Sequence, residues 1–123
     1  MATQNELADR CSVIEECYEF MLAYAAQGVT GEQGGLGSQI RDCLNRASAA
    51  LTGLADAYAS RRDDPPYHAF LAVLGRDAQD SLAAVDLVLA QPSISSQLVD
   101  NLNASIHLRA LLTDLFLLDD VLK

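Results

Sequence analysis

The chain has 123 residues, the usual length of one domain, and half of them are hydrophobic while 20% are charged. This balance excludes a disordered chain, because burial of so many apolar residues can offset the entropy lost on folding. The net charge of −9 argues against nucleic acid or an anionic membrane as a partner, since both would repel the chain, and it permits a basic protein partner.

The sequence shows neither a membrane span nor a disulfide framework. No uninterrupted apolar run is long enough to cross a membrane, and the polar N-terminus does not have the basic and apolar regions of a signal peptide. Cys11, Cys17 and Cys43 are an odd number without CxxC spacing, which predicts free thiols packed within helices. We therefore expect a bacterial cytoplasmic protein with a single domain over residues 1–123.

The first predicted helix covers about residues 4–27, because its apolar side chains are spaced three and four residues apart and share one face. The residues of this face are Leu7, Cys11, Ile14, Tyr18, Met21 and Ala25. Residues 28–37 contain five glycines and end the helix. No strand precedes these glycines, so a flexible connector is favoured over a phosphate-binding loop.

A second helix is predicted over about residues 38–60, with Ser38 as its N-cap. Its apolar face consists of Ile40, Leu44, Ala47, Leu51, Leu54 and Tyr58. A third helix is predicted over about residues 65–90, with Asp64 as its N-cap and Pro65 as its first residue. Its apolar face consists of Phe70, Val73, Leu74, Ala78, Leu82, Val85 and Leu89.

Pro92 interrupts the chain again, and a fourth helix capped by Ser93 is predicted over about residues 94–122. Its buried positions are Leu98, Leu102, Ile106, Leu111 or Leu112, Leu115, Leu118 and Leu122. Helices of about 24 residues are each about 36 Å long, and similar lengths with short connections favour antiparallel neighbours. The sequence therefore predicts an all-α fold, specifically an antiparallel up-down four-helix bundle.

The end of the fourth predicted helix has more apolar residues than one buried face can hold, because successive leucines point about 100° apart. A second surface usually covers such a helix, so we expect either a partner protein or a homodimer contact here. Carboxylates near a helix C-terminus are mildly unfavourable, and a basic partner would stabilise them. The candidate interaction surface consists of Leu108, Asp114, Leu117, Asp119, Asp120 and Val121.

No arrangement of residues typical of catalysis, metal binding or cofactor binding occurs in the sequence. Neither His68 nor His107 follows a glutamate by three residues, as the histidines of di-iron bundles do. We therefore expect a small acidic helical protein-interaction module (an adaptor, regulator or chaperone) that is not an enzyme and holds no cofactor or metal. Two alternatives remain open: a bundle that binds a small molecule in its core beside Gly53 and Gly75, and a histidine phosphotransfer domain acting through His107.

Overall fold

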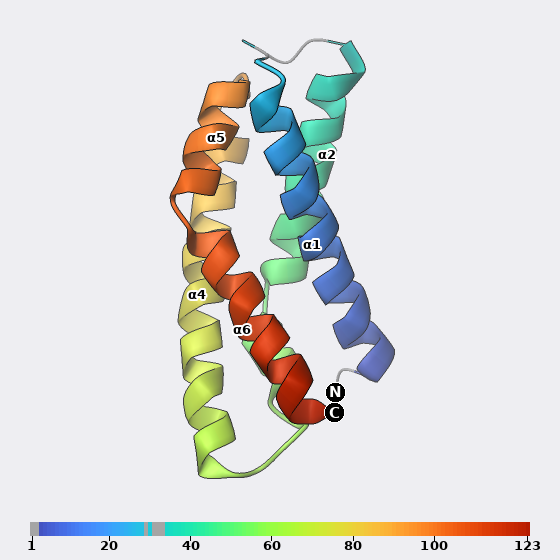
Figure 1. Ribbon diagram of the computed structural model, residues 1–123, viewed down its shortest axis with the longest axis vertical. Coiled ribbons are helices and arrows are strands. Elements are labelled where there is room, and N and C mark those ends of the chain that lie inside the picture. The colour runs from blue at the N-terminus through green and yellow to red at the C-terminus, as the bar shows by residue number, and fades with distance from the viewer. Residues whose placement is uncertain (1–2, 29, 31–33) are drawn as a thin grey trace.

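A computed structural model describes the backbone of residues 3–28, 30 and 34–123, and the side chains of all of these except residues 34–36. Every regular element in this part of the chain is an α-helix, which confirms the all-α prediction. The helices are α1 (Gln4–Ala26), α2 (Gly34–Leu51), α3 (Leu54–Tyr58), α4 (Pro65–Leu89), α5 (Ser96–Ala104) and α6 (His107–Leu122). In Figure 1 the start of α1 and the end of α6 lie at the same end of the molecule. None of these helices has the length and apolar character needed to cross a membrane.

The starts of α1 and α4 agree with the sequence-based predictions, because local signals fix both. The Thr3 hydroxyl accepts a hydrogen bond from the Glu6 N–H, and the Glu6 carboxylate accepts one from the Thr3 N–H, each at 3.1 Å. α4 begins at Pro65, directly after Asp64. However, the Asp64 carboxylate makes no capping bond and accepts a hydrogen bond from Arg62 instead.

The second expected helix, residues 38–60, is divided into α2 and α3. The division falls at Gly53, whose φ of +66° is a left-handed conformation that glycine adopts without strain. The apolar spacing continues across this break, since Leu51 and Leu54 are both buried. A periodic pattern alone therefore did not reveal the interruption.

The predicted start of this helix is also wrong. α2 begins at Gly34, so Ser38 lies within the helix and is not its N-cap. Residues 34–37 of the expected glycine connector are therefore helical. Residues 29 and 31–33 of that connector lie outside the described residues.

The fourth expected helix, residues 94–122, is divided into α5 and α6. Ser95 rather than Ser93 caps α5, and its hydroxyl accepts a hydrogen bond from the Leu98 N–H at 3.1 Å. Between the two helices Ile106 has φ of +63°, and its side chain is 60% exposed, so its predicted burial is wrong. Figure 1 shows α6 leaving this turn at an angle to α5.

Buried apolar side chains from all six helices form one core cluster. α1 packs against α2, α5 and α6, while α4 packs against α2, α3, α5 and α6. The core is joined to the α4–α5 connection by buried hydrogen bonds. The Tyr24 hydroxyl donates to the Ile94 carbonyl at 2.6 Å, and the Ser96 hydroxyl donates to the Tyr24 carbonyl at 2.6 Å.

Two arginines bind the C-terminal ends of neighbouring helices. Arg41 of α2 donates hydrogen bonds to the carbonyls of Leu89 and Gln91 at the end of α4, at 3.0 and 2.6 Å. Arg10 of α1 binds the end of α2 in the same way. The last carbonyls of a helix have no helical partner and carry partial negative charge, so a guanidinium both satisfies and neutralises them.

The Arg41→Lys variant should show what this contact contributes to stability. An ammonium group is not a planar fork and cannot reproduce the paired geometry, so we expect the free energy of unfolding to fall by about 1 kcal/mol. Urea unfolding followed by circular dichroism measures the change. Arg46→Lys is the matched control, because Arg46 is exposed and its ion pair with Glu16 is long at 3.7 Å. Equal effects of the two substitutions would contradict the assigned role of Arg41.

Candidate interaction surface

Exposed apolar side chains gather on the last turns of α6. Six large hydrophobic side chains are exposed in the described part of the chain, and three of them are Phe116, Leu117 and Val121, at 53%, 51% and 43% exposure. The structure therefore places the predicted Leu117 and Val121 at the surface. Leu108, which was expected beside them, is only 3% exposed. It lies on the buried face of α6, so its inclusion in an accessible surface is wrong.

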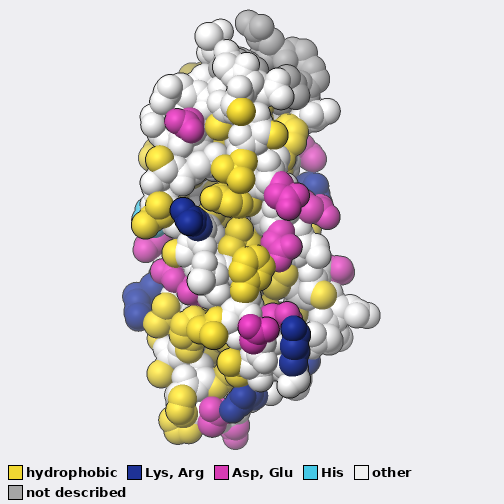
Figure 2. All heavy atoms as spheres, in the orientation of Figure 1, with side chains coloured by type: hydrophobic (Ala, Val, Ile, Leu, Met, Phe, Trp, Pro, Cys, Tyr) yellow, Lys and Arg dark blue, Asp and Glu magenta, His cyan; other side chains and the backbone are white. Residues whose placement is uncertain are grey.

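A groove lies beside Leu117 and Val121, between the start of α4 and the end of α6. This α4–α6 groove has a volume of about 380 Å³. Its lining residues are Arg62, Asp64, Pro66, Tyr67, Phe70, Leu117, Leu118 and Val121. Tyr67 and Leu118 are buried, so the groove opens directly onto the core. Figure 2 shows hydrophobic side chains gathered over the lower parts of α4 and α6, where the groove lies.

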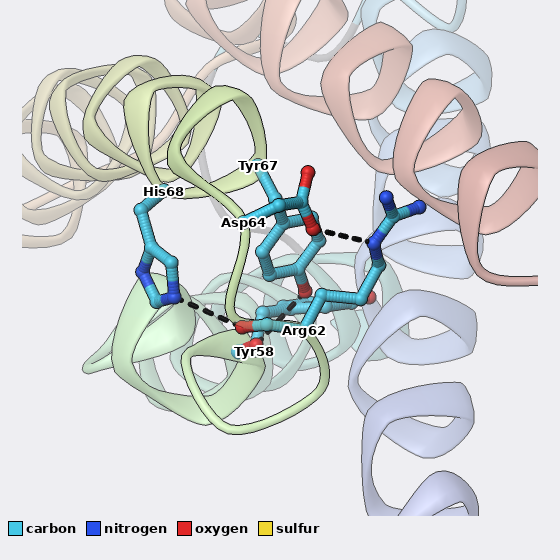
Figure 3. A network of polar contacts seen from close by, with 5 residues as sticks. All are labelled: Tyr58, Arg62, Asp64, Tyr67 and His68. Carbon is cyan, nitrogen blue, oxygen red and sulfur yellow. Dashed lines mark hydrogen bonds and ion pairs between the residues drawn. The ribbon is translucent and has the colours of Figure 1, made fainter.

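A network of polar contacts at the turn between α3 and α4 lies at one end of this groove (Figure 3). The Tyr67 hydroxyl donates a hydrogen bond to the Tyr58 carbonyl at 2.8 Å. Arg62 lies 5.8 Å from the centroid of the Tyr67 ring and donates from Nε to the Asp64 carboxylate at 2.8 Å, which lowers the pKa of Asp64. Nε2 of His68 is 2.9 Å from the Arg62 carbonyl oxygen. These contacts position the Tyr67 ring as a fixed wall of the groove.

The predicted acidic residues at the end of α6 do not all face the groove. Asp119 and Asp120 are both exposed. Asp120 pairs with Lys123 at 3.5 Å, and Asp119 lines a separate pocket between α6 and α1. The structure therefore divides the predicted surface, with apolar residues on the groove side of α6 and Asp119 on the other side.

Asp114 is not a surface residue in the predicted sense. It lies on α6 and interacts electrostatically with Asp77 of α4, and its Oδ2 atom is buried without a hydrogen-bond partner. Burial, followed by the interaction with Asp77, raises the pKa of Asp114 to about 7. Sequence reasoning missed Asp77. Its position three residues after the buried Leu74 was the available signal.

The cysteines and histidines are also placed by the structure. The three cysteines are free thiols, as predicted: Cys17 and Cys43 are buried, while Cys11 is half-buried. Sγ of Cys17 donates a hydrogen bond to the Cys43 carbonyl at 3.0 Å. His107 is the half-buried first residue of α6, and a phosphotransfer role for it stays a prediction. Within the described residues, no group of three or more His, Cys, Asp or Glu side chains is arranged to hold a metal ion.

Three hollows lie beside α6 in the described part of the chain: the α4–α6 groove and two pockets between α6 and α1, one lined by Asp119 and the other by Arg109. The α4–α6 groove is mainly apolar and includes one carboxylate, Asp64, whereas the pocket lined by Asp119 includes two, Glu15 and Asp119. Comparisons with protein-family models, with curated proteins and with solved structures find no match to this chain.

Proposed function

We propose that the protein is a small acidic interaction module, without catalytic activity, that binds a basic amphipathic helix of a partner protein in the α4–α6 groove. The observation that carries this proposal is the exposure of Leu117 and Val121 along an apolar groove. These residues are four apart and therefore project from the same face of α6. An amphipathic helix can lay its own apolar face into a groove of this kind.

The charge of the chain favours a basic partner over a second copy of the same chain. Each copy carries a net charge of −9, so two copies repel one another, whereas a helix rich in lysine is attracted. Asp119 and Asp120 are exposed on the same helical turns as the apolar residues. Such exposed charges speed association and select the sign of the partner's charge more than they increase affinity.

We also propose that the architecture is an interrupted form of an up-down four-helix bundle. In this arrangement α2 with α3 forms the second helix, and α5 with α6 forms the fourth. The proposal is supported by contacts that join α1 to α2, α2 to α4, α4 to α6 and α5 to α1, which closes a ring. In this proposal the positive φ angles of Gly53 and Ile106 mark the interruptions within the second and fourth helices.

A binding experiment with model helices tests the proposed function. The probe is a fluorescent peptide of about 18 residues, about 27 Å long as a helix, with leucines on one face and lysines on the other. Fluorescence anisotropy should show binding of this peptide. A peptide of the same pattern with glutamates in place of lysines should bind much more weakly. In the Leu117→Ser/Val121→Ser variant we expect binding about tenfold weaker, a loss of about 1.4 kcal/mol.

Leu87→Ser is the matched control variant, because Leu87 is 66% exposed on α4 but is not among the residues that line the groove. It lies 17 or more residues beyond the groove residues of α4, about 25 Å along the helix. Equal binding by the control and by the double variant would contradict the proposal. Light scattering on the free protein tests whether a second copy of the chain occupies the groove instead. If the protein is a dimer and the double variant is a monomer, the groove is assigned to the second copy.

A further inference from the structure

A second hollow, the α1–α6 pocket, lies on the opposite side of α6 from the groove. It has a volume of about 250 Å³ and is lined by side chains of α1, α3 and α6 together with Lys123. Its apolar walls include Leu7 and Leu115, which are 3% and 2% exposed, and the more exposed Phe116 and Leu122. The pocket is smaller than a typical site for a drug-sized ligand, so it suits a short apolar stem.

The inner polar groups of this pocket are neutral. Sγ of Cys11 lies 3.2 Å from the hydroxyl oxygen of Tyr58, and both residues line the pocket. Burial raises the pKa of both groups, so thiol and phenol remain protonated at neutral pH. A neutral thiol behaves as a small hydrophobic group and is a poor nucleophile. An apolar stem can therefore approach these groups without displacing water from a charge.

Negative charge is concentrated on the same pocket. Glu15 of α1 and Asp119 of α6 both line it, and neither forms an ion pair with another described residue. Burial is the largest cause of the raised pKa of the Cys11 thiol, and the charges of Glu15 and Asp119 raise it further. Lys123 also lines the pocket, but its ammonium group is paired with Asp120. The pocket therefore combines apolar walls with two carboxylates that form no ion pair with another described residue.

We propose that the α1–α6 pocket binds a primary ammonium group carried on an apolar stem. The stem packs against Leu7 and Leu115, and the ammonium group lies between the carboxylates of Glu15 and Asp119. Free alkylamines have this chemistry, and so does a lysine side chain of a protein. The site is separate from the α4–α6 groove and does not depend on the function proposed for that groove.

Protection of Cys11 from thiol-specific modification measures occupancy of the pocket. The rate of reaction with a methanethiosulfonate, which does not modify amines, is determined at Cys11 by peptide mass mapping, with hexylamine or hexanol present. The buried Cys17 and Cys43 report any general unfolding in the same experiment. We expect hexylamine to slow the reaction of Cys11 about fivefold at a concentration where hexanol has little effect. Equal protection by hexylamine and hexanol would overturn the proposal. So would the absence of protection by hexylamine, by hexanol and by the leucine–lysine peptide alike.

Charge variants test the role assigned to the two carboxylates. In the Glu15→Gln/Asp119→Asn variant the concentration of hexylamine needed for half-protection should rise about tenfold. Asp100→Asn is the control, because Asp100 is exposed on α5, does not line the pocket and forms no ion pair with another described residue. An unchanged half-protection concentration in the double variant would also overturn the proposal.

A third arm distinguishes the two sources of the ammonium group. Hexylamine is compared with the leucine–lysine peptide and with the same peptide after acetylation of its lysines. Protection by hexylamine shows that a free amine occupies the site, whereas protection by the unacetylated peptide alone assigns it to a lysine of a protein. The Leu117→Ser/Val121→Ser variant should keep its protection by hexylamine, so failure of the groove proposal and failure of the pocket proposal are distinguishable.

Discussion

The Leu111→Asp variant should be largely unfolded at neutral pH, with a free energy of unfolding lower by at least about 4 kcal/mol. Leu111 has no exposed surface and belongs to the core cluster of α6. Aspartate would remove its apolar contacts and place an unpaired carboxylate in the core. The free energy of unfolding of native proteins is only about 5–15 kcal/mol, so a loss of about 4 kcal/mol is a large fraction of it. Circular dichroism and urea unfolding measure the loss.

Leu117→Asp is the matched control for this substitution. It introduces the same side chain on the same helix, but at a position that is 51% exposed. We expect a folded protein whose free energy of unfolding differs from the wild type by less than about 0.5 kcal/mol. A folded Leu111→Asp variant, or equal destabilisation by both substitutions, would contradict the division of α6 into a buried and an exposed face.

Helix α1 and the start of α4 could be predicted from the sequence because their signals are local. The reciprocal bonds of Thr3 and Glu6 involve residues three apart, and Pro65 fixes its own backbone angle at the first helical position. Neither signal depends on a distant part of the chain. The three-and-four spacing of buried residues in α1 is likewise a property of one helix.

The two helix breaks could not be predicted in the same way, because apolar spacing continues through them. Leu51 and Leu54 are both buried although Gly53 separates their helices. At the second break Ile106 is a β-branched residue in a left-handed conformation, which such residues rarely adopt. α6 packs against α4, which is distant in sequence, and local sequence signals do not predict such packing.

The apolar part of the candidate surface was predictable, whereas its surroundings were not. Successive leucines at the end of the chain exceed what one buried face can hold, and this excess correctly predicted the exposure of Leu117. Tyr67 and Phe70 form the facing wall of the groove but come from α4, nearly 50 residues earlier. The carboxyl pair of Asp77 and Asp114 also joins two helices that are distant in sequence. Only the tertiary structure brings these residues together.

The carboxyl pair should make the stability of the protein depend on pH. Asp114 has a pKa of about 7 in the folded protein against 3.8 for an ordinary aspartate. Between these two values the folded state keeps a proton that the unfolded state releases. The contribution of Asp114 to stability is therefore full below about pH 4, is lost as the pH rises through about 7, and changes little above that.

The Asp114→Asn variant should remove this dependence. At pH 8 the wild type carries a carboxylate next to Asp77, with one oxygen buried and unpaired, whereas asparagine is neutral and can donate a hydrogen bond. After allowance for solvent screening, we expect the variant to be more stable than the wild type by about 1.5 kcal/mol at pH 8 and by only about 0.5 kcal/mol at pH 5. Urea unfolding at the two pH values measures the difference, and Asp120→Asn should follow the wild type because its carboxylate is exposed and paired with Lys123.

A second substitution separates the two causes of the raised pKa. Burial is the largest single cause of the raised pKa, so Asp77→Asn should reduce the pH dependence without abolishing it. If Asp77→Asn abolished the dependence completely, repulsion between the carboxylates rather than burial would be its main cause. If Asp114→Asn still lost stability between pH 5 and pH 8 to the same extent as the wild type, another group would be responsible. The groove residue Leu118 lies one turn after Asp114 on the same side of α6, so the pH dependence of peptide binding, measured beside that of stability, shows whether this pair also affects the groove.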